Sequence, residues 1–216
     1  MKNKRKNSIL KNINRRGMVG IEAAIVLIAF VIVAAAFSFM VVNMGLFATQ
    51  RGRDTVQQGL QEASTPLTLD GSILIRGNSD GDGIDVIIIP LKTMGVEYVP
   101  MGTNTTVVTL RIENKTAYAN IYQGINTTDP TGKTFDQLVT GLSGSSTQAK
   151  LFIENSDGDN SLDFQEKGYL IIYLKSADNA VKRDHIFIEI RPEKGAPLSI
   201  EFVVPSELQS GYITVG

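Results

Sequence analysis

One stretch of the sequence limits what the chain can fold into more than any other. Residues Ala23–Val42 read AAIVLIAFVIVAAAFSFMVV, which is 20 residues without a charge. As a helix, this stretch would be about 30 Å long, the thickness of the hydrocarbon core of a bilayer. A helix that is apolar on every face requires lipid or an apolar protein environment around it. The stretch therefore predicts contact with a membrane, with other protein chains, or with both in turn.

The residues before this stretch are strongly basic. Residues 1–17 contain seven Lys or Arg side chains and no acid, whereas residues 18–216 contain 14 basic and 22 acidic side chains. A basic run can indicate nucleic-acid binding. A basic flank directly before an apolar span is instead typical of membrane targeting with the N-terminus on the cytoplasmic side. We therefore expect the membrane as a partner and no nucleic acid.

Three interpretations of this N-terminus compete. The first is a secretory signal cut within Val33–Phe37, although the apolar cores of such signals run only about 7–15 residues. The second is a permanent membrane anchor. The third rests on Arg15-Arg16-Gly17-Met18, with Glu22 four residues after Met18, which resembles the processing site of class III signal peptides. That resemblance implies recognition of Arg15, Arg16 and Gly17 by a prepilin-type membrane peptidase, which cuts between Gly17 and Met18.

A longer resemblance supports the third interpretation. The segment Gly20–Gly77, through NMGLFATQ and EASTPLTLDGSILIRG, is similar to archaeal flagellins (archaellins) of the type IV pilin-like superfamily. The resemblance implies a structural subunit that polymerises through its N-terminal helix into the extracellular, rotating swimming filament. It also implies passage through the cytoplasmic membrane as a precursor, a motor and export complex as partner, and no enzymatic activity. The expected parts are a removed leader (1–17), a filament-core helix (18–64) and an outer domain (65–216).

The helix contains three glycines that require a reason. It has no Pro from Val19 to about Ala63, and Pro66 is expected to stop it. Gly45, Gly52 and Gly59 recur every seven residues, and each costs about 1 kcal/mol relative to Ala. Close approach of another helix is one explanation. Chance occurrence or a flexible joint is the alternative.

Glu22 is the costly residue of the apolar span. A carboxylate there is disfavoured by up to about 3 kcal/mol at mid-bilayer, and by less near the edge. It either reaches the headgroups or takes part in assembly. In the second case, the cut after Gly17 exposes an α-amino group on Met18, and Glu22 of a neighbouring subunit pairs with that amine. The resemblance implies such an assembly role at this position.

After Pro66 the pattern is that of β-structure. Short runs rich in β-branched residues alternate with Gly, Asn, Asp and Pro, which predicts eight or nine strands and no second helix. The fold class is therefore α+β, a long N-terminal hydrophobic α-helix followed by an antiparallel β-sandwich of the Ig-like kind. Residues Thr131–Ser146 are expected to form a long surface loop. The expected strands are Ser72–Arg76, Ile84–Leu91, Thr105–Ile112, Ala117–Tyr122, Ala149–Glu154, Tyr169–Leu174, Asp184–Ile190, Ile200–Val204 and Tyr212–Val215.

Three glycosylation sequons lie close together in the chain. They begin at Asn104, Asn114 and Asn126, outside the helix and the leader. Each Asn-X-Thr sequence is weak evidence alone, but the cluster lies in an exported domain. We expect a glycoprotein in which residues 104–128 form a solvent-facing, sugar-bearing region.

One acidic loop has the spacing of a calcium site. Residues 155–166 align with a twelve-residue Ca²⁺ loop and offer oxygen donors at alternating positions, which hard cations require. Asn160 stands where such loops have Gly, and Asn tolerates the left-handed conformation. A structural Ca²⁺ is one interpretation, and a solvated hairpin turn is the other. No cofactor is required. The donors would be Asn155, Asp157, Asp159, Asp163 and Glu166. Asn78–Gly83 repeats the opening of this loop and is expected to be mostly a turn.

The sequence gives little support to catalysis. It contains no Cys and one His, which excludes disulfides, Cys-ligated zinc and multi-His metal sites within one chain. His185 follows Asp184, but no Gly-x-Ser-x-Gly elbow surrounds any Ser. Two alternatives to the archaellin interpretation stay open, an adhesive type IV-like pilin and a secreted or membrane-anchored β-sandwich that binds a ligand or calcium.

Overall fold

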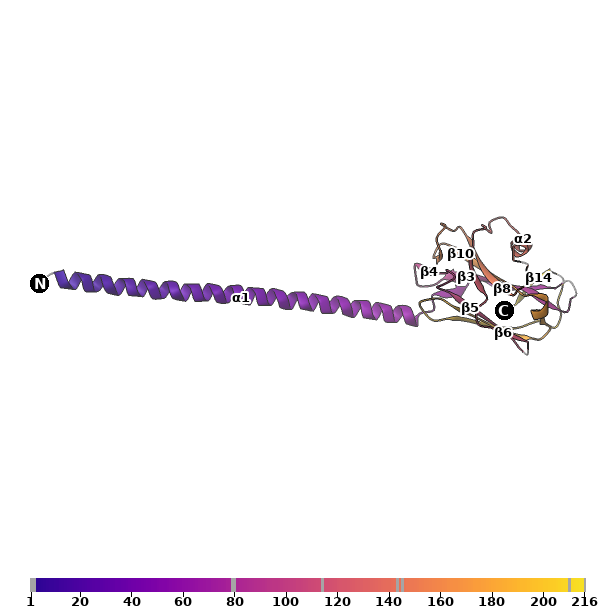
Figure 1. Ribbon diagram of the computed structural model, residues 1–216, viewed down its shortest axis with the longest axis horizontal. Helices are drawn as coiled ribbons and strands as arrows, with labels where there is room; N and C mark the ends of the chain where they lie inside the picture. The colour runs from indigo at the N-terminus through magenta and orange to yellow at the C-terminus, as the bar shows by residue number, and fades with distance from the viewer. Residues whose placement is uncertain are drawn as a thin grey trace. The chain divides into compact units, whose positions relative to one another are not determined.

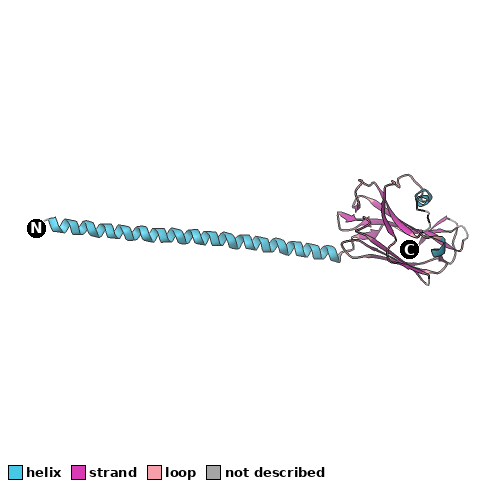
Figure 2. Ribbon diagram, in the orientation of Figure 1, coloured by secondary structure: helices cyan, strands magenta, loops and turns pink. Residues whose placement is uncertain are grey.

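The structure is a computed structural model with a long helix and a β-rich part (Figures 1 and 2). It describes the backbone of residues 3–215, apart from 79, 80, 114, 143, 145 and 210. Side chains are described from residue 20 onward, apart from these positions and residues 61–63. The chain divides into two compact units, Met1–Gln58 and Gly59–Gly216.

Helix α1 runs over 61 residues, from Asn3 to Ala63. Its C-terminal end lies where Pro66 predicted it, because a proline ring disfavours the helical conformation of the residue before it. Ser64 makes the last helical bond, from its backbone N to the carbonyl O of Leu60 at 3.0 Å. The helix begins 15 residues before the expected start at residue 18, since the leader contains no Pro and is rich in good helix formers.

The larger sheet of the second unit has eight strands. Its main path is β14-β2-β3-β10-β8-β7, and β1 and β11 also pair with β3. All of its pairs are antiparallel except β7 with β8, which is parallel. The strands are β1 (Leu67–Leu69), β2 (Ile73–Gly77), β3 (Gly83–Thr93), β7 (Tyr122–Asn126), β8 (Gln148–Glu154), β10 (Lys167–Tyr173), β11 (Ala180–Val181) and β14 (Gly211–Val215).

Two smaller sheets complete this unit. A four-stranded antiparallel sheet has the order β13-β12-β5-β6, and a two-stranded sheet pairs β4 with β9. The strands are β4 (Tyr98–Pro100), β5 (Val107–Ile112), β6 (Thr116–Tyr118), β9 (Ser161–Asp163), β12 (His185–Arg191) and β13 (Leu198–Val203). A 3₁₀ turn, η1 (Ser176–Asp178), follows β10.

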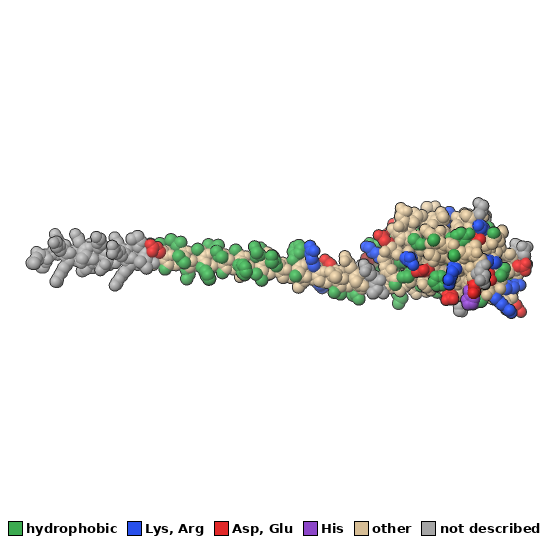
Figure 3. Space-filling view, turned by 60° about the horizontal axis from the view of Figure 1, so that its bottom comes forward, with side chains coloured by type: hydrophobic (Ala, Val, Ile, Leu, Met, Phe, Trp, Pro, Cys, Tyr) green, Lys and Arg blue, Asp and Glu red, His purple; other side chains and the backbone are tan. Residues whose placement is uncertain are grey.

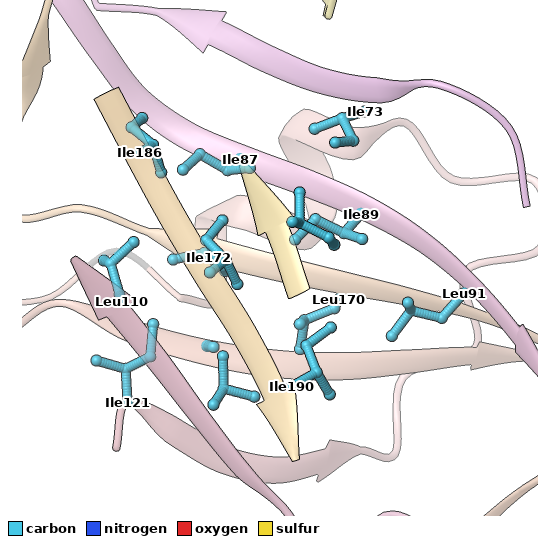
Figure 4. Packing of buried hydrophobic residues seen from close by; sticks show 14 of the residues in the cluster. Ile73, Ile87, Ile89, Leu91, Leu110, Ile121, Leu170, Ile172, Ile186 and Ile190 are labelled. Atoms are coloured by element: carbon cyan, nitrogen blue, oxygen red, sulfur yellow. The ribbon is translucent and has the colours of Figure 1, made fainter. Parts of the chain in front are cut away.

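The main core lies between the eight-stranded and four-stranded sheets. Buried residues of β3 and β10 contribute one side of this cluster, and buried residues of β5 and β12 contribute the other (Figure 4). As predicted, β5 and β12 alternate between buried and exposed or half-buried positions. This alternation is expected of strands that cover a core on one face only. The sandwich of mostly antiparallel sheets, preceded by a long apolar helix, is therefore confirmed.

The larger sheet is covered on its other face by a short helix that the sequence did not reveal. Helix α2 (Phe135–Thr140) lies within the expected loop Thr131–Ser146. Its Leu138 and Val139 pack in a second buried cluster with residues of β3, β8 and β10. This cover explains why β3 and β10 read as continuous apolar runs, since both faces are buried. The prediction of no second helix is wrong because a helix of six residues is too short to show an apolar period.

Ion pairs and rings hold α2 against the sheet. The Arg76 guanidinium donates to Asp85 at 2.6 Å and to Asp136 of α2 at 3.1 Å. The hydroxyl of Tyr212 donates to the same Asp136 at 2.8 Å. The Phe135 ring lies 5.7 Å from those of Tyr169 and Tyr212, between centroids. Residues far apart in sequence thus fix the helix.

Eight of the nine expected strands are present within two residues of their predicted bounds. The ninth, Ala117–Tyr122, is wrong because the chain leaves β6 at Tyr118 and begins β7 at Tyr122, in the other sheet. The count of eight or nine strands is too low, since β1, β4, β9 and β11 have only two or three residues each. Such short strands leave no readable alternation in a sequence.

A buried carboxylate links the two sheets of the sandwich. Asp178 is 3% exposed, and its Oδ2 accepts hydrogen bonds from Tyr118 of β6 at 2.6 Å and from Thr147, next to β8, at 2.5 Å. The Lys175 ammonium lies 3.7 Å from the same oxygen. Burial alone would raise the pKa of this carboxyl, but the two hydrogen bonds and the lysine outweigh it and lower the pKa below its usual value.

The lowered pKa of Asp178 predicts that its contribution to the stability of the fold is lost in acid. Because the folded-state pKa of Asp178 is depressed, its contribution is present above the unfolded pKa of about 3.9 and is lost as pH falls through the folded pKa. We expect Asp178→Asn to lower the free energy of unfolding by about 1–3 kcal/mol at neutral pH. As pH falls from 5 through the folded-state pKa of Asp178, the variant should also lose less stability than the wild type. Urea unfolding across this range measures both effects, with exposed Glu207→Gln as the control. A pH profile of Asp178→Asn parallel to that of the wild type would contradict the prediction.

Candidate assembly site

Among the described residues, nothing covers the apolar surface of α1. Residues Gly20–Leu60 form a helix long and apolar enough to cross a membrane, and none of the apolar window is buried. Its described large apolar side chains are between 53% and 74% exposed (Figure 3). Burying one such side chain contributes about 1.5–3 kcal/mol. A surface of this size requires lipid or further protein.

Glu22 lies on this helix as an exposed side chain, as expected of a residue available to a second molecule. The backbone of residues 15–18 is helical and continuous with it. The side chains of Arg15, Arg16, Gly17 and Met18 lie outside the described residues. The roles assigned to these four residues and to Glu22 stay predictions.

The three glycines of the heptad repeat have open space around them. A Cβ atom built on Gly45, Gly52 or Gly59 would meet no atom within 4 Å. No contact with the described part of the chain therefore explains why these positions lack a side chain. Close packing against the helix of a second copy stays the prediction that gives them a reason.

The sequons differ in their surroundings. Asn104 is exposed in a turn, but Thr106 of its sequon is fully buried and donates to the carbonyl O of Pro100 at 3.0 Å. Asn126 is half-buried at the end of β7, and its Oδ1 accepts from the backbone N of Thr128 at 2.9 Å. Asn114 lies outside the described residues. Glycosylation stays a prediction at all three.

The expected solvent-facing region over residues 104–128 is wrong as a whole. Strand β5 of the four-stranded sheet lies in this region, and its Val108, Leu110 and Ile112 belong to the main core. Only the turns and the outward-facing side chains of this region reach solvent. Successive side chains of β5 point to opposite faces of the sheet, so every second one is buried in the core. A cluster of sequons therefore does not make a uniformly exposed segment.

The acidic loop brings three of its five predicted donors together. The carboxylate oxygens of Asp157, Asp159 and Asp163 lie within 4.8 Å of one another. The positive φ angles fall on Asn155 (61°) and Gly158 (93°), not on Asn160 as predicted. The chain turns earlier than in the aligned calcium loop, because Ser161–Asp163 already form β9 and pair with β4.

Glu166 holds this loop closed from inside. It is 7% exposed, and its two carboxylate oxygens accept from the backbone N of Asp157 at 3.1 Å and of Asp163 at 2.9 Å. Asp159 accepts from the backbone N of Ser161 at 2.7 Å. These bonds account for the loop as a hairpin turn. A structural Ca²⁺ stays a prediction beside that interpretation.

Removal of the Glu166 carboxylate is expected to lower the stability of the fold even when no cation is present. Glu166→Ala leaves two backbone N–H groups without their acceptor and should lower the free energy of unfolding by about 1–3 kcal/mol in EDTA. Thermal unfolding of the protein measures this effect, with exposed Glu207→Ala as the control. The calcium interpretation further expects added Ca²⁺ to raise Tm in the wild type, but not after Asp157→Ala with Asp159→Ala. If added Ca²⁺ leaves the Tm of the wild type unchanged, the calcium interpretation is contradicted and the loop is a hairpin turn.

His185 and Asp184 have different partners in the structure. Its Nδ1 lies 3.6 Å from a Glu201 carboxylate oxygen on the neighbouring strand. Asp184 instead accepts from the backbone N of Val181 and lies 3.8 Å from the Lys115 ammonium. Within the described part of the chain, the hollow lined by His185 has Phe187 and Arg111 on its walls and no Ser.

The family model described as archaeal-type flagellin matches residues 17–202. The chain belongs to the archaeal-type flagellin family. A probable flagellin 1 from Aeropyrum pernix is 41% identical over 201 residues, which cover 91% of this chain and 96% of that protein. A probable flagellin 1 from Archaeoglobus fulgidus is 32% identical, with 91% and 94% covered.

The fold of the chain is also that of solved archaeal flagellins. The crystal structure of archaeal flagellin FlaB1 from Methanocaldococcus jannaschii matches with a TM-score of 0.55 and 18% identity, over 68% of this chain and 94% of that one. The archaeal flagellum of Methanospirillum hungatei strain JF1 matches with a TM-score of 0.53 and 24% identity, over 90% and 98%. This flagellin-family chain is a structural filament subunit.

Proposed function

We propose that the chain, once its leader is removed, polymerises through α1 into the extracellular filament of the archaellum. The observation that supports this most is the uncovered apolar surface of Gly20–Leu60. Side by side with copies of itself, this surface becomes the interior of a helix bundle. The second unit then forms the exterior, since it has a buried core of its own.

The same surface explains a stage in the membrane before assembly. Lipid tails are as apolar as leucine side chains, so the hydrophobic effect alone does not favour helix association over lipid. Close packing and charge pairing must then supply the difference. We assign these roles to the glycines at 45, 52 and 59 and to Glu22 paired with the Met18 amine of a neighbour.

Removal of the leader makes that amine available. The Arg-Arg-Gly sequence at the edge of the apolar span and a family match that begins at residue 17 both support a cut after Gly17. Residues 1–17 contain all of the positive charge that orients the precursor with its N-terminus in the cytoplasm. The partner for this step is a prepilin-type membrane peptidase.

The exterior of the filament would be acidic. Residues 65–216 contain 12 basic and 19 acidic side chains, so mutual repulsion keeps neighbouring filaments apart in solution. Sugars on the sequons would add to this coat. We propose that the filament is turned by a separate motor and export complex, and that this subunit transmits torque without enzymatic activity of its own.

Deletion of the gene separates motility from adhesion. Deleted cells should keep other surface filaments but lose swimming, and a copy of the wild-type chain should restore it. Loss of surface attachment with normal swimming would instead identify an adhesive pilin. Assembly is the same in both cases, so the test concerns only the use of the filament.

A further inference from the structure

Asn43 is a polar side chain on the uncovered apolar surface of α1. The described side-chain hydrogen bonds of α1 run from Ser38, Thr49 and Thr55 to carbonyl groups of the same helix. Asn43 makes none among the described residues, so its amide is free to bind a group of a second molecule. It lines a shallow hollow whose other residues are Ala36, Phe39, Met40, Met44 and Phe47.

The position of Asn43 suits a membrane, but it requires a partner in a helix bundle. Glu22 directly precedes the apolar span Ala23–Val42, and Asn43 directly follows it. The two polar residues are about 32 Å apart along the helix, so both reach the headgroup regions of a bilayer. Once α1 packs in a filament, apolar side chains surround Asn43, and a buried amide without hydrogen bonds is unfavourable. Assembly must therefore give Asn43 a partner on another helix.

The acceptor that α1 itself offers is Ser38. Within residues 23–47 of the sequence, Ser38 and Asn43 are the only polar side chains. The exposed hydroxyl of Ser38 donates to the carbonyl O of Ala34 at 2.8 Å. This bond uses the hydroxyl proton and leaves the oxygen free to accept. Ser38 can therefore receive a hydrogen bond from the amide nitrogen of Asn43 in a neighbouring copy.

Asn43 and Ser38 lie on different faces of the helix. At about 100° per residue, the five residues between them correspond to about 140° around the axis. Asn43 lies about 60° from Glu22, whereas Ser38 lies seven residues before Gly45 and within about 20° of it. A contact between Asn43 and Ser38 is therefore heterologous, and each copy can bind a further copy in the same way.

One stagger between neighbouring helices satisfies Asn43 and Glu22 together. Pairing Asn43 with Ser38 of a parallel neighbour shifts that neighbour by five residues, about 7.5 Å along the axis. Pairing Glu22 with the Met18 amine, as proposed above, shifts the neighbour by four residues, about 6 Å, in the same direction. The two shifts differ by about 1.5 Å, the rise of one residue. Because a contact staggered along the axis does not close into a ring, its repetition extends a filament.

We propose that Asn43 of one subunit donates a hydrogen bond to the Ser38 hydroxyl oxygen of the next copy, and that this bond sets the stagger between their α1 helices. The hollow around Asn43 receives the Ser38 face of the neighbour, where Gly45 leaves room for the approach. A single polar residue in an apolar helix seam specifies register in coiled coils in the same way. The inference rests on the proposed filament function and names the residues that fix its register.

A double-mutant cycle tests the hydrogen bond. Asn43→Ala should raise the protein concentration at which diluted filaments dissociate by about fivefold, which corresponds to one net hydrogen bond of about 1 kcal/mol. In chains that already contain Ser38→Ala, the same substitution should raise this concentration by less than about twofold. Sedimentation after dilution gives the measurement.

Thr55→Ala is the matched control for the cycle. It removes a hydroxyl that is bonded to its own helix in the same way but lies on another side of it. In this background, Asn43→Ala should keep its full effect. An equal effect of Asn43→Ala with and without Ser38→Ala would overturn the proposal.

Cross-linking tests the stagger directly, since the chain contains no Cys. Ala36 lines the hollow around Asn43, and Val31, five residues earlier, lies on the face of Ser38. Cells that express Ala36→Cys and Val31→Cys chains together should give filaments that form disulfide-linked dimers on mild oxidation, because the stagger brings the two positions together. Each variant assembled alone should give none. The pair Ala36→Cys and Val41→Cys, which tests a shift in the opposite direction, should also give none.

Three results of this experiment would overturn the proposal. They are dimers from Ala36→Cys alone, which indicate no stagger, dimers from the pair with Val41→Cys, and filaments without any dimers. In each case filaments still form, so the proposed filament function stands. Absence of filaments from the wild-type chain would instead contradict the filament function itself.

Discussion

Chains that contain Glu22→Gln are expected to be processed and inserted in the membrane normally, but to be recovered in filaments more than a hundredfold less. The substitution keeps the size of the side chain and removes its charge. The Met18 amine of a neighbour would then be buried in the helix bundle without a carboxylate, which costs about 3–5 kcal/mol. Each 1.4 kcal/mol is about tenfold in an equilibrium constant. Immunoblots of sheared filaments and of membranes measure the two pools.

Asp54→Asn is the matched control for this variant. It removes a carboxylate from the same helix, but from the part where polar residues and Arg51 and Arg53 are close in sequence. We expect filaments at close to the wild-type level. Wild-type yields from Glu22→Gln would show instead that Glu22 reaches the lipid headgroups and takes no part in assembly.

Gly195→Ala is expected to lower the free energy of unfolding of the second unit by about 3–5 kcal/mol, the sum of a strained backbone and an overpacked contact. Gly195 has φ +96°, and a Cβ atom there would lie 2.6 Å from Cδ of Pro66 and 2.9 Å from the carbonyl O of Ser64. Neither atom can move easily, since one belongs to a proline ring and the other accepts the backbone N–H of Ala196 at 3.0 Å. Thermal unfolding and limited proteolysis at residues 64–67 measure the loss.

Gly71→Ala separates the two causes of this loss. Gly71 has a similar φ of +117°, but a Cβ atom there meets nothing within 4 Å. This variant should therefore show the backbone strain alone, about 1–3 kcal/mol. If both variants lose the same stability, the contact between Gly195 and Pro66 does not hold the start of the domain in place.

The sequence predicted those parts of the fold that repeat a signal over many residues. The apolar span and Pro66 predicted the end of α1, and alternation predicted β5 and β12. Helix α2 escaped because its stability comes from contacts across long sequence separations. Arg76 bonds to Asp136, 60 residues later, and Tyr212 bonds to the same carboxylate, 76 residues from it.

The candidate site shows the same division. The assembly residues on α1 were evident from the sequence, because an acid or a glycine in an apolar helix departs from its surroundings. The two backbone hydrogen bonds that Glu166 accepts were not evident, since the spacing of the acidic loop assigned this carboxylate to a cation. The Asp178 link was hidden as well, because its partners lie 31 and 60 residues away.

We propose that this chain assembles after losing its leader, with the whole apolar helix retained. Amino-terminal sequencing of the protein recovered from isolated filaments tests it most directly. We expect a chain that begins at Met18. A chain that begins at Phe37, without most of the apolar span, or at Met1, with the basic leader still attached, would contradict it.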